Sequence, residues 1–185
     1  MDNGASSYRR FLDGDDEGMV DIIRDYKDGL ILYLYGYVNN IFTAEELMEE
    51  TFFKLVTKKP MFTGKYTFKT WLYTIGRNAA VDYLRHHKKI ASIPMDELAG
   101  HLVEEESVER AYLREEQRIV LHRAMCKLNA EYRQVLYLIY FEGFSNSEAA
   151  RAMNKSRRQI ENLVYRAKQA LKAQLEKESF VYEEL

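Results

Sequence analysis

Helix-breaking residues are scarce in this chain, and the scarcity limits the folds that it can adopt. Glycine and proline together make up 11 of the 185 residues, and no proline follows Pro94. This is about half the usual share of these two residues. A fold of many strands needs turn residues every few positions, so the sequence predicts an all-α protein.

Apolar periodicity divides the chain into two helical units. The segment KKPMFTGK, residues 58–65, holds Pro60 and Gly64 and is typical of a loop. Apolar residues at helical spacing predict helices on both sides of it, namely a short one around Val20–Tyr26, a second over 30–41, a third from an N-cap at Thr43 to Leu55, and a long one from about Thr67 into RHHKK. We expect two small helical domains, residues 1–90 and 109–185, joined by an acidic linker over 91–108.

Composition excludes several classes of protein. Apolar residues make up 46% and charged residues 30%, as in ordinary water-soluble globular proteins. The longest apolar stretch, residues 30–38, is far shorter than the roughly 20 residues that cross a bilayer. The first ten residues lack the apolar core of a secretory signal. We therefore expect no membrane insertion and a cytoplasmic location.

Charge is distributed in blocks along the chain. Residues 1–53 hold 4 basic and 12 acidic side chains, whereas residues 54–89 hold 9 basic and 1 acidic. Residues 151–172 form a second basic block, with 7 basic side chains and 1 acid. Two such blocks are expected of a protein that contacts nucleic-acid phosphates at two places, although solvated helix faces would give the same pattern.

Two capping-box signatures mark a helix-turn-helix over about residues 146–165. Ser145 precedes Glu148 by three residues, and Ser156 precedes Gln159 by three, with the short turn MNKS between the two helices. In this motif the start of the second helix enters the major groove, where polar side chains contact base edges. The candidates are Arg157, Arg158, Gln159, Glu161 and Asn162. The alternative is an ordinary helical hairpin inside a larger core.

A block of alternating aromatic and basic residues covers positions 65–89. Its aromatic residues are Tyr66, Phe68, Trp71 and Tyr73, and its bases include Lys65, Lys69, Arg77 and Arg85. Aromatic rings stack on unpaired bases while Lys and Arg follow the phosphates, so this block predicts contact with single-stranded nucleic acid. A core stripe is the alternative for Phe68 and part of Trp71. Asn78 and Asp82 share one helix face and offer polar groups to a base or to water.

Three segments resemble one family, in the order and at the spacing of that family. They are AEELMEETFFKL (44–55), TFKTWLYTIGRNAAVDYLRHHKK (67–89) and LNAEYRQVLYLIYFEGFSNSEAARAMNKSRRQIENLVYRAKQAL (128–171). The chain resembles the extracytoplasmic-function (ECF) group of the sigma-70 family of RNA polymerase sigma factors. The resemblance implies region 2 and region 4 domains that bind core RNA polymerase and promoter DNA. It also makes an inhibitory anti-sigma protein a candidate partner, since such inhibitors are frequent in the group.

The resemblance assigns three sets of residues. A helix that docks on the β′ clamp helices corresponds to Glu45, Glu46, Leu47, Glu49, Glu50 and Phe53. Recognition and opening of the minus-ten element is assigned to Lys58, Lys59, Phe62, Lys65, Tyr66, Lys69, Trp71, Tyr73, Arg77, Asn78, Asp82 and Arg85. Region 4, which also meets the β flap, would contact the minus-thirty-five element through Ser156, Arg157, Arg158, Gln159, Glu161, Asn162 and Arg166.

Departures from the family pattern are few. Glu161-Asn162-Leu163 stands where many members are basic, which removes phosphate contacts. Ala149-Ala150 replaces the more frequent Ile-Ala and reduces core volume.

Other functions are disfavoured by the sequence. The segment DGDDEG, residues 13–18, begins like a calcium loop, but Arg24 occupies the position that needs a bidentate Glu. Cys126 is the only cysteine, the histidines lack the spacing of a metal site, and no nucleotide-binding or nucleophile motif is present. We expect no metal, cofactor or catalytic residue. The remaining alternatives are a ligand-responsive helix-turn-helix repressor and an all-helical protein adaptor.

Overall fold

A computed structural model of the chain describes residues 3–87, 120, 121 and 123–183. These residues form helices and no strand, which confirms the predicted fold class. The predicted linker over 91–108 and the predicted start of the second unit at 109 lie outside the described residues. None of the described helices combines the length and the hydrophobicity needed to span a bilayer.

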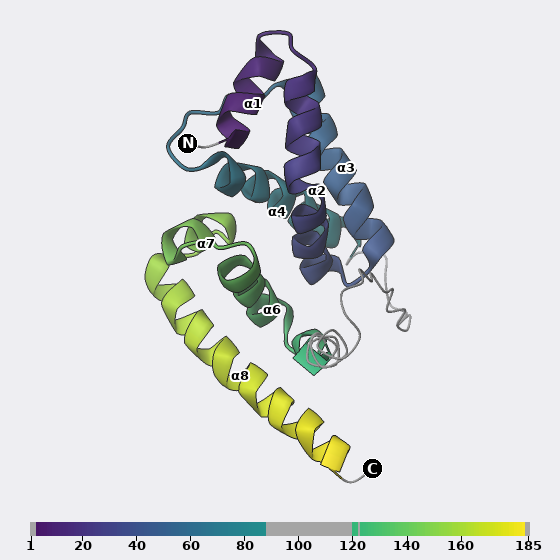
Figure 1. Cartoon of the computed structure of the whole chain (residues 1–185), viewed down its shortest axis with the longest axis vertical. Coiled ribbons are helices and arrows are strands. Elements are labelled where there is room, and N and C mark those ends of the chain that lie inside the picture. Colours follow the sequence, from purple (N-terminus) through teal and green to yellow (C-terminus); the bar gives the residue numbers. More distant parts are fainter. Residues whose placement is uncertain (1–2, 88–119, 122, 184–185) are drawn as a thin grey trace, which may run out of the picture.

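The helices form two groups (Figure 1). The first group, the N-terminal bundle, consists of α1 (Asn3–Leu12), α2 (Glu17–Val38), α3 (Ile41–Lys58) and α4 (Phe68–His87). The second group, the C-terminal unit, consists of α6 (Ala130–Leu136), the π-helical turn η1 (Tyr137–Phe141), α7 (Asn146–Ala152) and α8 (Arg157–Glu183). Helix α8 runs along the outer side of the C-terminal unit, and α7 lies close to α4 (Figure 1).

The N-terminal bundle has an aliphatic centre and an aromatic end. Leu30, Leu34, Leu55 and Leu72 are each completely buried where α2, α3 and α4 meet. Each such side chain contributes about 1.5–3 kcal/mol relative to exposure in water. At the other end, the ring of Tyr8 on α1 lies 5.6 Å from that of Phe68 and 5.4 Å from that of Trp71, measured between centroids. Helix α1 therefore covers the start of α4, although the sequence analysis did not predict α1.

Two helix boundaries differ from the prediction. The segment predicted as two helices over 20–41 is a single helix, α2, because its apolar face continues without interruption through Ile22, Leu30 and Leu34. It stops where Asn39 adopts a left-handed conformation with φ 53°. The predicted N-cap at Thr43 is wrong. Asn40 caps α3 instead, and its Oδ1 accepts a hydrogen bond of 3.0 Å from the backbone N–H of Thr43.

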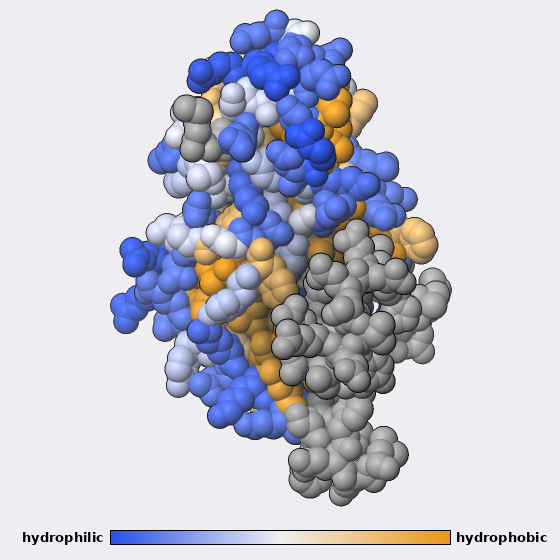
Figure 2. All heavy atoms as spheres, in the orientation of Figure 1, coloured by the Kyte–Doolittle hydropathy of each residue, from blue (hydrophilic) through white to orange (hydrophobic). Residues whose placement is uncertain are grey.

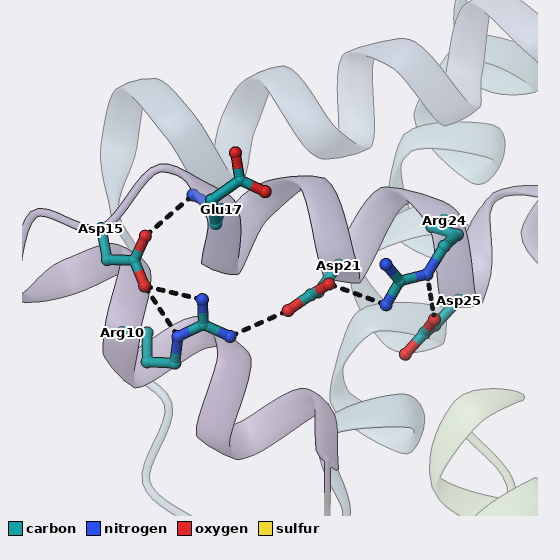
Figure 3. Close-up of polar contacts among 6 residues, drawn as sticks. All are labelled: Arg10, Asp15, Glu17, Asp21, Arg24 and Asp25. Carbon is teal, nitrogen blue, oxygen red and sulfur yellow. Dashed lines mark hydrogen bonds and ion pairs between the residues drawn. The ribbon is translucent and has the colours of Figure 1, made fainter.

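A charged network fixes the corner between α1 and α2 (Figure 3). Arg10 pairs with Asp15 at 2.7 Å and with Asp21 at 2.9 Å. Asp21 also pairs with Arg24, and Asp15 accepts a hydrogen bond from the backbone N–H of Glu17. Within the DGDDEG segment it is therefore the carboxylate of Asp15 that holds the corner and the first turn of α2.

Buried side chains of both groups form one continuous cluster. Helix α2 contacts α6, and α4 contacts α7. The ring of Tyr73 on α4 lies 5.3 Å from that of Phe144, which precedes α7. Figure 2 shows hydrophilic surface over the tip of the bundle and an apolar stripe over the C-terminal helices. The two units therefore pack against each other, which the sequence did not predict.

Candidate functional site

The outer face of α3 carries acids around exposed apolar side chains. Glu45, Glu46, Glu49 and Glu50 are all exposed. Phe53 is 67% exposed, and Phe42 and Val56 are exposed on the same helix. Leu47 is only 3% exposed and packs in the core, so its assignment to this surface is corrected: it supports the helix from inside. The face is suited to a partner that buries Phe53 and supplies positive charge.

The loop between α3 and α4 is anchored to the bundle at two points. The hydroxyl of Tyr8 donates a hydrogen bond of 2.9 Å to the backbone carbonyl of Pro60. Phe62 packs on Phe68 and Trp71, with ring centroids 5.7 and 5.2 Å away. Phe68 is completely buried and Trp71 is half-buried, so the core-stripe alternative holds for Phe68 and part of Trp71, and Phe62 closes the loop over the same core.

The remainder of this loop faces solvent. Lys58, Lys59, Lys65 and Tyr66 are exposed, and the ammonium of Lys65 lies 5.7 Å from the centroid of the Tyr66 ring. An exposed ring beside a lysine offers a stacking platform and a phosphate contact to an unpaired base.

Helix α4 presents only part of its predicted binding face to solvent. Asn78, Asp82 and Arg85 are exposed, with Arg85 paired to Asp82 at 3.2 Å, and Arg77 is half-buried. Tyr73 is completely buried, so the assignment of its ring to a stacked base is wrong for this arrangement of the units. Burial raises the pKa of the Tyr73 hydroxyl well above its usual range, which keeps the phenol neutral.

The two predicted capping boxes are present. The hydroxyl of Ser145 accepts a hydrogen bond from the backbone N–H of Glu148, whose carboxylate accepts one of 2.9 Å from the backbone N–H of Ser145. Gln159 and Ser156 make the same exchange at the start of α8, at 2.7 and 3.2 Å. With α7 and α8 joined by a short turn, the predicted helix-turn-helix is confirmed.

The first turns of α8 are open to solvent. Arg157, Arg158, Gln159, Glu161, Asn162 and Arg166 are all exposed, while Ile160, Leu163 and Ala167 pack inward as predicted. Arg157 pairs with Glu161 at 2.9 Å, and the side-chain oxygen of Gln159 is used by its capping box. The side chains of Arg158, Asn162 and Arg166 form no hydrogen bond or ion pair with the described residues, and Arg158 and Asn162 lie nearest the start of α8, so they are the side chains most available to a base edge.

Comparison with known proteins identifies the family. A family model described as Sigma-70 region 2 matches residues 22–90, and one described as Sigma-70, region 4 matches residues 118–171. The ECF RNA polymerase sigma factor SigM of Bacillus subtilis is 31% identical over 83% of this chain and 92% of its own length. The chain belongs to the ECF group of the sigma-70 family. It is a transcription initiation factor whose partners are core RNA polymerase and promoter DNA.

Two further relatives of this sigma factor extend the comparison. SigW of B. subtilis is 26% identical over 88% of the chain and 91% of its own length. The solved structure of the sigma factor RpoE of Bartonella quintana, determined with the anti-sigma factor NepR, superposes with a TM-score of 0.63 at 23% identity. That superposition covers 84% of this chain and 97% of the other, and supports the fold.

The C-terminal unit of this sigma factor covers part of the surface that the sequence analysis assigns to the minus-ten element. The Lys69 ammonium lies 2.6 Å from the Glu142 carboxylate and donates a 2.8 Å hydrogen bond to the Glu142 carbonyl oxygen. The guanidinium of Arg151 lies 5.0 Å from the centroid of the Tyr66 ring. Sequence reasoning missed Glu142 and Arg151 in this role. Helical periodicity describes one element at a time and gives no signal for a contact between distant elements.

Proposed function

We propose that this sigma factor binds core RNA polymerase through the outer face of α3. The observation that carries this proposal is the 67% exposure of Phe53 beside four acids that have no ion-pair partner among the described residues. Burial of a large apolar side chain within a charged rim is typical of an interface hot spot. The clamp helices of β′ are the proposed partner of this face, and the β flap that of the C-terminal unit.

Charge reversal tests this surface. The double substitution Glu49→Lys with Glu50→Lys should weaken core binding without lowering the melting temperature, because both side chains are exposed. Asp13→Lys with Asp16→Lys changes the net charge equally at another exposed site and serves as the matched control. Normal core binding by the α3 variant, measured by competition with the wild-type chain, would show that this face is assigned wrongly.

For the minus-ten element we propose that the loop after α3 captures an unstacked base. Flipping a base out of the duplex costs a few kcal/mol. Stacking on an aromatic ring returns about 1–3 kcal/mol per base, so binding energy from Tyr66 and the nearby lysines is comparable with the cost. Lys58, Lys59, Lys65, Lys69, Arg77, Asn78, Asp82 and Arg85 are the proposed polar and phosphate contacts.

A premelted template separates opening from binding. Lys65→Ala with Tyr66→Ala should reduce transcription from a duplex promoter far more than from a promoter with an open minus-ten bubble. Thr63→Ala, an exposed change in the same loop, is the control. An equal loss on both templates, or no loss on either, would show that the loop does not assist melting.

The wider proposal is a two-domain binding subunit that performs no catalysis itself. Residues 1–90 serve as region 2, residues 91–108 as linker and residues 109–185 as region 4, all acting on RNA polymerase in the cytoplasm. An anti-sigma protein is the proposed inhibitor, a suggestion supported by the complex of the B. quintana relative with NepR. Purified chain added to core polymerase should give promoter-dependent transcription. A repressor or adaptor would give none.

A further inference from the structure

The minus-ten surface of α4 and the loop before it are contacted by one segment of the C-terminal unit, residues 142–151. Glu142 holds Lys69, Phe144 covers the ring of Tyr73, and Arg151 lies over Tyr66. The hydroxyl of Thr67, just before α4, donates a hydrogen bond of 3.2 Å to the carboxylate of Glu148. Of the contacted residues, Lys69 and Tyr66 are assigned to DNA by the proposed function, whereas Tyr73 and Thr67 are their neighbours.

Glu142 is the centre of this contact. Its carboxylate is 12% exposed and its partner Lys69 is 30% exposed, so the pair is partly screened from water. The hydroxyl of Tyr137 donates its single proton to this carboxylate at 2.8 Å, and its oxygen also lies 3.3 Å from the backbone carbonyl oxygen of Gly29 on α2. The π-helical turn that ends at Phe141 brings Tyr137 and Glu142 to the same point, so the carboxylate is held in position against α4.

We propose that Glu142 occupies the place of a promoter phosphate on Lys69 and that this sigma factor inhibits its own minus-ten binding. The inference rests on the proposed function of the loop and α4. A carboxylate offers two anionic oxygens to an ammonium, as a phosphate does, and the pair cannot form while Lys69 contacts DNA. Promoter binding therefore requires the C-terminal unit to leave α4.

Population arithmetic gives the expected size of the effect. The apparent affinity of a ligand is reduced by the fraction of molecules in the competent state, so weakening the closed arrangement raises affinity for DNA. Removing a partly exposed pair changes an equilibrium by about two- to fivefold. Glu142→Gln should therefore bind a single-stranded minus-ten oligonucleotide about threefold more tightly than wild type, and Glu142→Lys more tightly still, because it repels Lys69.

Matched variants distinguish the effect of separating the two units from the effect of a change in net charge. Glu176→Gln and Glu176→Lys change the net charge equally on α8, where Glu176 pairs only with Lys172 of the same helix among the described residues. Gly29→Ala adds no charge, but its new methyl group would lie 2.6 Å from Oε1 of Glu142 and 2.6 Å from the hydroxyl of Tyr73. It should open the units as charge reversal does. Lys69→Ala should also open them, yet without a gain in DNA affinity, since it removes the proposed DNA contact.

The experiment uses the full chain without polymerase. Oligonucleotide binding is measured by fluorescence anisotropy, with a scrambled oligonucleotide for comparison, and the radius of gyration by small-angle X-ray scattering. We expect Glu142→Lys and Gly29→Ala to bind more tightly and to be more extended than wild type. Equal binding by the Glu142 and Glu176 variants would overturn the inference, as would tighter binding without any increase in size.

Transcription by holoenzyme distinguishes this inference from the proposed function. If wild-type holoenzyme initiates at a promoter while the Glu142 variants bind the minus-ten oligonucleotide with the same affinity as wild type, the self-inhibition inference is wrong and the proposed function stands. If the holoenzyme does not initiate and every variant binds the minus-ten and scrambled oligonucleotides equally, the proposed function has failed as well.

Discussion

Gly18 is a position where a single methyl group should separate two helices. A Cβ at this residue of α2 would lie 2.3 Å from the backbone oxygen of Ser7 and 2.8 Å from the backbone nitrogen of Phe11. Ordinary van der Waals contact begins near 3.4 Å, so α1 must move away by about 1 Å. Both neighbours are backbone atoms of α1, and no change of rotamer can relieve the contact.

The expected cost of Gly18→Ala follows from two opposing effects. Overpacking of a rigid contact costs about 1–3 kcal/mol, and alanine at Gly18, the second residue of α2, recovers only a small part of the roughly 1 kcal/mol that it gains over glycine in a helix interior. The free energy of unfolding should therefore fall by about 1–2 kcal/mol. For a chain of this length, that corresponds to a decrease of about 2–8 °C in melting temperature.

The matched control is Gly36→Ala in the same helix. There the nearest atom to a new Cβ is Cγ of the Gln134 side chain, at 3.2 Å, and this side chain can shift. Its stability should be unchanged or slightly higher, because alanine favours the helix. Thermal and urea unfolding followed by circular dichroism measure both variants. Equal stability of Gly18→Ala and wild type, or an equal loss in both variants, would refute the steric argument.

A functional consequence should accompany the loss of stability. Helix α1 carries Tyr8, which holds the loop after α3 at Pro60. Displacement of α1 should therefore reduce transcription from a duplex promoter more than from a premelted one, even at a temperature where Gly18→Ala is fully folded.

Three further predictions concern single side chains. Ser145→Ala removes the cap of α7 and should lower the free energy of unfolding by about 1 kcal/mol, whereas Ser147→Ala, an exposed neighbour, should not. Burial raises the pKa of Tyr8 to about 12, so its stabilising effect is complete below about pH 10 and is lost as the pH rises through 12. Urea midpoints measured between pH 8 and pH 11 should therefore fall less steeply for Tyr8→Phe than for wild type. Arg158→Ala should relax base discrimination at one minus-thirty-five position by about 1–3 kcal/mol, while Arg157→Ala should cost less, because Arg157 is already paired with Glu161. Equal, sequence-independent losses of DNA affinity in both variants would mean that both arginines contact phosphates.

Local sequence signals predicted the helix-turn-helix in detail. The two capping boxes depend on side chains three residues apart, and such short-range hydrogen bonds form whenever the helix forms. The inward positions Ile160, Leu163 and Ala167 followed from periodicity for the same reason. The helix boundaries at Asn39 and Asn40 were not predicted from the sequence. Asparagine suits both the left-handed residue that ends a helix and the N-cap that begins one, so the sequence alone does not show which asparagine takes which role.

Contacts between distant elements were beyond the sequence argument. Tyr73 belongs to an aromatic-basic pattern that is equally consistent with a stacked base and with a buried ring, and the packing of Tyr33 and Phe144 against its ring decides between them. Lys69 presents the same difficulty, since a lysine beside aromatic residues suits a phosphate as well as Glu142. The chemistry that makes Tyr73 and Lys69 suitable for contact with DNA also makes them suitable for contact with Phe144 and Glu142 of the same chain.

A count of acidic residues does not show which of them are paired within the protein. The first 53 residues hold 12 acids, and the sequence treats them alike. In the structure, Asp15 and Asp21 are paired with Arg10 and Arg24 at the corner between α1 and α2, whereas Glu49 and Glu50 on α3 have no ion-pair partner among the described residues. Like charges on one helix face oppose folding slightly unless another molecule supplies the opposite charge. A positively charged partner can therefore neutralise the unpaired acids of α3. Because salt screens this attraction, core binding through α3 should weaken as the salt concentration rises. The Arg10 network lies within the bundle and takes no part in that binding.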